Sequence, residues 1–572
     1  MKQAKKLAAV LLSLMLVLAL AVPASAQTGN YSITITDTNS NHTYTAYQIF
    51  KGDISGSDTE PDPYVLSNIQ WGTGVETAGL ITTLKEVEGF TTLADDATAA
   101  DVAKLLANAG ALDTFLGVIN GTPGFLGEPT GNGVTPGPEQ ATCTINLTEA
   151  GYYLVKDAVA VGAVGQSVSD YIVQVLGNVQ MEPKDSDVPT VEKKVFDQEY
   201  AQIDAEGVYG TGYNDVADWK IGDSVPFKLI GSIPDMSAYD TYEYIFTDTL
   251  SNGLTLQEGT IDVYIAVDKN DEVGEYTPLT AGKDYTLNVQ NVGANGGGSF
   301  SIAFDDLKTA PHMDQGNRQY VIVTYDATLN ANAEIGLDGN LNRVNLQFSN
   351  DPNGDGLGRT TEDTVIVFTY ELDGTKVDGE NENTKLEGAE FVLFNGGHTR
   401  VAHIENGKLV EWVDLPDEYN SNNYQQIPYE TWETFNKTTN VIMKSAAEGA
   451  FGVSGLDDGT YHLMEIKAPN GYNLLEGDVQ LVIEATTVNG QTWNGVANTA
   501  LTALTINVAN EGAVNGKTDT GAVNVTVRNN QGATLPETGG MGTTLFYIIG
   551  GLLVVGAGIL LVVRIRMRSH NE

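Results

Sequence analysis

Two lysines stand in segments whose alternating pattern predicts β-strands, where a charged side chain is out of place. Alternation puts Lys193 on the face that Val191 and Val195 share, and it puts Lys376 on the face of Leu372. A buried ammonium without a partner is costly, so each lysine should be paired, deprotonated or consumed in a reaction. Because a neutral lysine amine is a nucleophile, both residues are candidates for covalent chemistry.

Each lysine has an asparagine on a matching strand toward the other end of its domain. Asn342 opens an alternating run that follows Lys193, and Asn529 ends a run of alternating valines that follows Lys376. A bond within either pair would close a loop of about 150 residues and could stabilise the domain by about 5 kcal/mol. Strand parity leaves three neighbouring partners open, namely Lys194, Asn345 and Asn350.

Such a bond needs a third group that polarises the asparagine amide and moves protons, and a carboxyl group kept protonated by apolar surroundings can do this. Asp248 shares a strand face with Tyr244 and Phe246, and Glu465 shares one with Tyr461. The reaction would occur once on the chain's own residues, so it does not make the protein an enzyme. No Ser-His-Asp order and no phosphate loop is present, and the six histidines are scattered, so no His or Cys metal cluster is expected.

The elements that must position these side chains are short alternating runs rich in Val, Thr, Ile and Tyr, broken by Gly, Asn and Asp. Such runs predict an all-β chain of tandem immunoglobulin-like sandwich domains. A helix is expected over 98–109, as an insertion in the first domain, with Asp101 in a capping box and Val102 on its apolar face.

Two junctions divide the chain. Residues 182–189 hold two prolines and alternating charge, which predicts a short stiff linker, and residues 349–356 form a turn cluster before a new strand. We therefore expect an N-terminal domain at 27–183, a middle sandwich at 184–363 and a third sandwich at 364–530. Whether the first domain has a covalent bond of its own is left open.

Charge and cysteine content limit the classes of function. The formal net charge is −44, which argues against nucleic acid and anionic lipid as partners. Cys143 is the only cysteine, so a disulfide within the chain cannot stabilise the domains.

Both ends of the chain have the composition of targeting segments. Residues 1–26 have a charged start, a short apolar run and small residues before Gln27, as in a secretory signal peptide. Residues 531–572 hold a pentapeptide, an apolar run over 545–563 that is about 28 Å long as a helix, and then three arginines. The pentapeptide is Leu535, Pro536, Glu537, Thr538 and Gly539.

This order of parts resembles the sorting signal of Gram-positive cell-wall proteins. The resemblance implies that a sortase cysteine cuts between Thr538 and Gly539 and hands the Thr538 acyl group to an amine. The chain is then an exported protein, retained briefly in the membrane before it reaches the cell wall.

Further motifs resemble the LPXTG-anchored major pilins of Gram-positive bacteria: the runs 44–50, 182–195 and 386–391, and Glu465 with its Ala-Pro-x-Gly-Tyr tail, which is similar to that family's E-box. The resemblance implies collagen-adhesin-type domains with Lys–Asn isopeptide bonds formed beside an acid. Residue by residue, these sets are Lys193, Asp248 and Asn342 in the middle domain, and Lys376, Glu465 and Asn529 in the third.

The family also implies a role for Lys184, which follows Pro183, as the pilin-motif lysine that attacks the Thr538 thioester of another subunit. Glu182 stands where many members have an aromatic residue. The implied function is the shaft subunit of a covalent pilus, with sortase, other copies of the chain, peptidoglycan, minor pilins and host surface ligands as partners. The alternative is a monomeric wall-anchored adhesin that binds a host ligand, and replacing Lys184 would distinguish the two.

One further pattern matches the spacing of a calcium loop. Its flanks are predicted strands rather than the helices of the usual calcium motif, and no other cofactor is expected. The matching residues are Asp351, Asn353, Asp355, Gly356 and Glu362.

Overall fold

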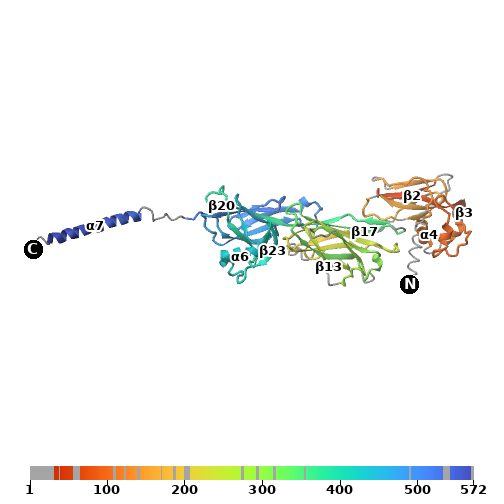
Figure 1. Ribbon diagram of the computed structural model, residues 1–572. Helices are drawn as coiled ribbons and strands as arrows, with labels where there is room; N and C mark the ends of the chain where they lie inside the picture. The colour runs from red at the N-terminus through yellow and green to blue at the C-terminus, as the bar shows by residue number, and fades with distance from the viewer. Residues whose placement is uncertain are drawn as a thin grey trace.

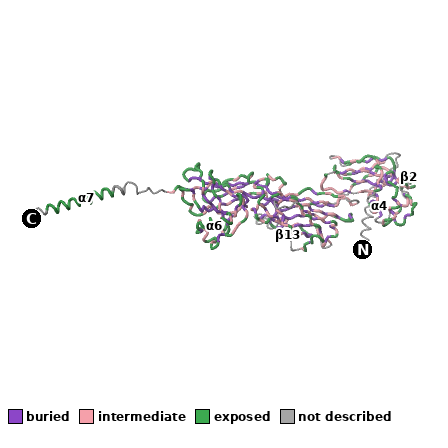
Figure 2. Tube along the Cα trace, viewed as in Figure 1, coloured by how far each residue is buried: buried purple, intermediate pink, exposed green. Residues whose placement is uncertain are grey.

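The computed structural model describes residues 31–568 apart from 38, 56–64, 107, 109–110, 121–123, 138–141, 161, 169, 184–187, 199–206, 272–275, 291–295, 314–316, 353–355, 489–490, 492 and 533–541. Three β-rich domains follow one another, and helix α7 (Gly542–Arg568) stands apart beyond the third (Figure 1). Buried residues lie along the inside of each domain (Figure 2). The expected all-β architecture of tandem domains is confirmed.

The first domain holds two sheets. One has the order β4-β1-β7 (Thr142–Leu147, Tyr31–Thr36, Asn178–Met181), and the other has the order β3-β2-β5-β6 (Val65–Trp71, His42–Ser55, Gly151–Val159, Tyr171–Val175). Strands β2 and β5 bury side chains on both faces. Tyr44 and Val155 face the core between the sheets, whereas Phe50 and Leu154 face a second core under the helices.

The helical layer of the first domain comprises α2 (Leu80–Leu84), α3 (Ala99–Leu105) and α4 (Ala111–Asn120) among the described residues. Helix α3 begins where the capping box predicts, because the Asp101 carboxylate accepts from the Thr98 backbone N–H at 3.0 Å and from its hydroxyl at 2.7 Å. Val102 is buried as expected, and the helix ends at Leu105 rather than at 109.

The middle domain is a sandwich of two sheets. Phe227 and Tyr325 from the first sheet meet Phe246 and Leu346 from the second in one core. The first sheet has the order β13-β16-β11-β8-β9 (Leu254–Ala266, Tyr320–Leu329, Ser224–Ser232, Val191–Phe196, Tyr213–Asn214). The second has the order β10-β19-β17-β12-β15-β14 with β18 on β17 (Val216–Asp218, Asp363–Phe368, Asn340–Ser349, Tyr244–Leu250, Gly298–Phe304, Thr286–Gln290, Leu357–Arg359).

The third domain is one continuous path of paired strands that packs around a single main core. Its first strand β20 and last strand β30 are parallel neighbours, with Lys376 opposite Val527. Helix α6 (Tyr429–Thr439), which the sequence analysis did not predict, buries Trp432 against Phe394 and Met464 outside that core. The strand order is β29-β28-β27-β26-β21-β22-β23-β25-β20-β30 with β24 on β21 (Gly512–Asn515, Leu501–Val508, Asp478–Thr487, Gly459–Lys467, Glu390–Asn395, Arg400–Glu405, Lys408–Asp414, Ala450–Leu456, Tyr370–Asp378, Ala522–Asn529, Met443–Lys444).

The middle and third domains are joined by a nearly continuous strand. β19 pairs with β17 in the middle sheet, and β20 begins after the single buried residue Thr369, whose hydroxyl donates to the Leu456 carbonyl at 2.9 Å. Alternate residues of β19 enter different cores, Val367 that of the middle domain and Phe368 that of the third. The middle sheet therefore runs to Phe368, beyond the expected boundary at 363.

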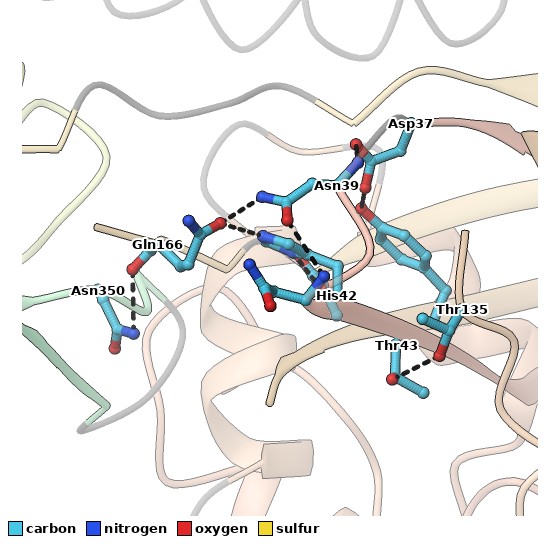
Figure 3. A network of polar contacts seen from close by, with 10 residues as sticks. Asp37, Asn39, His42, Thr43, Thr135, Gln166 and Asn350 are labelled. Atoms are coloured by element: carbon cyan, nitrogen blue, oxygen red, sulfur yellow. Dashed lines mark hydrogen bonds and ion pairs between the residues drawn. The ribbon is translucent and has the colours of Figure 1, made fainter. Parts of the chain in front are cut away.

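The first and middle domains meet through a polar network (Figure 3). His42 Nδ1 lies 2.8 Å from the Asp157 carboxylate, and His42 Nε2 lies 3.0 Å from Gln166 Oε1. The Asn350 amide donates to the Gln166 carbonyl at 3.4 Å, and the Val168 backbone N–H donates to the Asn350 carbonyl at 2.8 Å. Hydrogen bonds between loop residues make this junction, whereas a shared strand joins the middle domain to the third.

Helix α7 contains the apolar run expected near the carboxyl end. Residues Phe546–Met567 are long and apolar enough to cross a membrane, with a mean hydropathy of 2.6. None of the residues in that window is buried against the domains.

Candidate cross-linking sites

The third-domain site brings Lys376, Glu465 and Asn529 together, and all three side chains are nearly or fully buried. Lys376 Nζ hydrogen-bonds to Asn529 Oδ1 and lies 3.3 Å from Glu465 Oε1. Asn529 Nδ2 donates to both oxygens of Glu465, each at 2.9 Å. The amine therefore faces the amide carbonyl, while the carboxyl group faces the amide nitrogen.

Burial lowers the pKa of Lys376 below its ordinary value, and the charge of Glu465 opposes this shift only in part. A lower pKa favours the neutral amine, which is the nucleophilic form.

Neighbouring residues hold the third-domain site in register. Asp378 pairs with Asn529 across the two parallel strands, and the Tyr472 hydroxyl donates to Asp378 at 2.7 Å. Gly449 has φ 72°, and a Cβ there would lie 2.4 Å from the Lys376 carbonyl oxygen, so only glycine lets this turn approach β20 so closely.

The middle-domain site joins the two sheets of its sandwich. Lys193 extends from β8 and forms a fully buried ion pair with Asp248 of β12. The Tyr325 hydroxyl lies 2.8 Å from Lys193 Nζ and donates to Asp248 Oδ1 at 3.1 Å. Asn342 Nδ2 donates to the same hydroxyl at 2.7 Å, whereas Asn342 Oδ1 has no hydrogen-bond partner among the described residues.

The electrostatics of this site favour neutral groups. Burial lowers the pKa of Lys193 and raises that of Asp248, in each case against the attraction of the other. Asp363 anchors the lysine backbone by accepting the Lys193 N–H at 2.6 Å.

The structure places the alternative partners elsewhere. Lys194 faces away from the site and pairs with Asp215 at 2.5 Å. Asn345 is only half-buried, on the opposite face of β17 from Asn342. Asn350 lies at the junction with the first domain, so Asn342 is the asparagine that shares a site with Lys193.

A third set of the same residue types lies in the first domain, and the sequence analysis missed it. Lys156 Nζ donates to Asn120 Oδ1 at 2.7 Å, and Asn120 Nδ2 donates to Asp170 Oδ2 at 2.8 Å. Lys156 Nζ lies 3.5 Å from the same carboxylate oxygen, and burial raises the pKa of Asp170. These contacts repeat the pattern of the third domain, although the Lys156 side chain is 28% exposed.

Several expected residues lie outside the described part of the chain. They are the signal peptide, Lys184 and the pentapeptide from Leu535 to Gly539. Of the candidate calcium loop, Asn353 and Asp355 also lie outside it, whereas Asp351, Gly356 and Glu362 are among the described residues. Lys184 falls between β7 of the first domain and β8 of the middle domain, and the pentapeptide falls between β30 and α7.

Three protein-family models match separate parts of the chain. The Gram-positive pilin backbone subunit 2 Cna-B-like domain matches residues 221–352, and the SpaA prealbumin-like fold domain matches 371–495. The LPXTG cell wall anchor motif matches 528–567.

Two comparisons with individual proteins agree with these models. The chain is 23% identical over 391 residues to the trypsin-resistant surface T6 protein of Streptococcus pyogenes serotype M6, covering 60% of this chain and 65% of that protein. The solved T6 backbone pilin of the same serotype has a TM-score of 0.51 at 16% identity, covering 89% of this chain and 99% of that one, and it has a modular three-domain structure.

Proposed function

Since the chain belongs to the LPXTG-anchored backbone pilins, we propose that it is the repeating shaft subunit of a covalent pilus on a Gram-positive cell surface. A sortase cuts between Thr538 and Gly539, and the Lys184 amine of another copy takes the Thr538 acyl group and releases the sortase cysteine. The arginines that end α7 keep the tail on the cytoplasmic side until the cut. Peptidoglycan receives the last acyl group at the base of the fibre.

The observation that carries this proposal is the order of the parts. In the chain, Lys184 falls between the first and middle domains and the anchor follows the third domain, so two sandwiches joined by a nearly continuous strand separate the two reactive segments. An acceptor and a donor separated in the chain by two whole domains permit head-to-tail growth, which the monomeric adhesin does not require.

Replacing Lys184 tests polymerisation directly. In cells that hold the sortase, Lys184→Ala should collapse a ladder of high-mass species to monomer, because no amine remains to accept the acyl group. Lys437→Ala, at an exposed lysine of α6, is the matched control and should keep the ladder. A single monomer band from the unaltered chain would favour the wall-anchored adhesin instead.

We further propose that the buried lysines form isopeptide bonds with their asparagines. The Lys376 amine attacks the Asn529 side-chain carbonyl carbon, its proton passes through Glu465 to the departing nitrogen, and ammonia leaves. In the middle domain the Lys193 amine attacks the Asn342 side-chain carbonyl carbon, its proton reaches the departing nitrogen through Asp248 and the Tyr325 hydroxyl, and ammonia leaves. Each bond forms once on the chain's own residues, so the chemistry belongs to assembly rather than to enzymatic turnover.

The first-domain set extends this proposal to a third bond, between Lys156 and Asn120 with Asp170 as the acid. The intact mass of the mature protein distinguishes the possibilities, because each bond removes about 17 Da: about 34 Da for two bonds and about 51 Da for three. Glu465→Gln and Asp170→Asn should each restore about 17 Da. A mass without any deficit would contradict all three bonds, and no change in Asp170→Asn would remove the third.

A further inference from the structure

The fold brings together two of the six histidines, which the sequence analysis expected to stay scattered. His398 lies in the turn after β21, and His462 lies in β26. Both face Asp478 at the start of β27, although 80 and 16 residues separate them from it in the chain. This cluster is in the third domain and shares no residue with the cross-linking site there.

The donor atoms of the cluster converge on one point. His398 Nε2 lies 3.0 Å and His462 Nδ1 lies 2.6 Å from the same oxygen, Asp478 Oδ2. All three ligand atoms lie within 4.8 Å of one another. Donor atoms around a tetrahedral zinc ion lie about 3.4 Å apart, given bonds of about 2.0–2.1 Å, so small side-chain shifts would open this cluster to an ion.

A supporting shell already orients the three donors. The Tyr424 hydroxyl donates to the other carboxylate oxygen, Asp478 Oδ1, at 2.9 Å, which leaves Oδ2 for the imidazoles. The His398 ring stacks on Tyr424 with ring centres 4.2 Å apart, and it contacts the His462 ring in a tilted arrangement with ring centres 3.8 Å apart. The His462 ring also hydrogen-bonds to the Gly396 backbone, and ligating histidines typically make such a second contact.

We propose that His398, His462 and Asp478 bind a divalent transition-metal ion of the zinc class. Two imidazoles with one carboxylate suit zinc, copper or nickel, whereas calcium and magnesium require oxygen ligands. The fourth position is left to water, because three protein ligands close only part of a tetrahedron. On binding, the His462 ring proton would lie on the nitrogen that faces away from the ion, where the Gly396 backbone can accept it.

The side chains are sheltered but reachable. His398, His462 and Asp478 are 17%, 13% and 11% exposed, so an ion can enter from solvent without unfolding the domain. The ion would tie the turn after β21 to β26 and to the start of β27. This role is independent of the pilus proposal, since it concerns one domain of one chain.

Zinc retention by the purified full-length chain in detergent tests the site. The chain is dialysed against a zinc solution that also holds millimolar calcium and magnesium. These two ions compete with zinc for sites made of carboxylates alone. Zinc that stays bound is then measured by atomic emission. One zinc per chain is expected. His398→Asn should lose it, and asparagine is chosen because it tolerates the left-handed backbone at this position, φ 52°.

The matched control is His403→Asn, because His403 also lies near carboxylates, 3.5 Å from Glu405 and Glu411, yet belongs to no three-ligand cluster. It should retain zinc. Tyr424→Phe removes the hydroxyl that orients Asp478 and should weaken zinc binding about 10-fold while leaving the ligands in place. No bound zinc in the unaltered chain, or equal retention in His398→Asn, would overturn the site.

Discussion

The two buried lysines of the sandwiches reach their asparagines through different contacts. Lys376 meets the Asn529 amide directly, with Glu465 on its nitrogen side. In the middle domain the Tyr325 hydroxyl lies between the Asn342 amide and the carboxyl group of Asp248. Burial raises the pKa of Tyr325 well above its usual value, so the hydroxyl keeps its proton and can pass one along.

Tyr325→Phe should therefore slow bond formation in the middle domain by about 100-fold while leaving the third-domain bond unaffected. The measurement is a time course of intact mass after the chain folds. Tyr264→Phe serves as the control, since Tyr264 is also buried in this domain but its hydroxyl donates to the Asp271 carbonyl at 3.1 Å. Equal rates in the two variants would show that Tyr325 only packs against the site.

Strand alternation together with the family resemblance predicted the buried lysines, asparagines and acids of the two sandwiches, whereas alternation alone left Lys194, Asn345 and Asn350 open. It could not predict Tyr325, because the pattern marks this residue as an ordinary core position like Val323 and Ala327. The first-domain set could not be predicted for another reason. Lys156, Asn120 and Asp170 come from a strand, a helix end and a loop, so no single periodicity relates them.

At the level of secondary structure, some elements can be predicted from the local sequence pattern, and others depend on packing against distant residues. The strands and helix α3 follow from alternation and from a capping box. Helix α6 cannot be predicted in this way, because Trp432 is its only fully buried residue. The helix is stabilised when Trp432 packs against Phe394 and Met464. The nearly continuous course of β19 and β20 could not be predicted either, since a turn cluster precedes it and β19 joins the middle sheet through its pairing with β10 and β17.

The stability of the first domain should depend on pH through His42, which lies beside the junction with the middle domain. The hydrogen bond that the His42 imidazole donates to the Asp157 carboxylate raises the folded-state pKa of His42 above 6.5, although burial opposes this shift. The charged imidazole therefore stabilises the first domain fully below about pH 6.5, and this contribution is lost as the pH rises through the raised pKa. Calorimetry should show a first-domain melting temperature that falls as the pH rises above about 6.5.

His42→Gln should flatten that dependence, because glutamine does not titrate. His312→Gln removes a histidine from the middle domain and should leave the pH dependence as it is. If His42→Gln keeps the slope, another group controls the stability of the first domain.

Across the whole molecule, the proposed bonds define a short covalent route for tension. Force entering at Lys184 would reach Lys193, cross to Asn342, follow β19 into β20, cross from Lys376 to Asn529 and leave at Thr538. Strands β9–β16 and β21–β29 lie outside this route, and so does the entire first domain. A bond in the first domain would therefore resist heat or proteolysis rather than pulling.

Single-molecule pulling between positions 184 and 538 tests this route. The unaltered chain should lengthen little, because the cross-links exclude most of both sandwiches from the load. Glu465→Gln should add an unfolding step of about 500 Å, since the 153-residue span from Lys376 to Asn529 extends by about 3.3–3.6 Å per residue. A step of that size in the unaltered chain would contradict the third-domain bond.

The single buried residue between β19 and β20 also affects how the protein can be degraded. A protease binds its substrate as an exposed, extended segment, and such segments commonly occur between domains. Here the connecting residue, Thr369, is fully buried, and the strands on both sides are paired within sheets. Cleavage at this junction would first require a strand to leave two domains at once, so host or bacterial proteases would find no ready site between the middle and third domains.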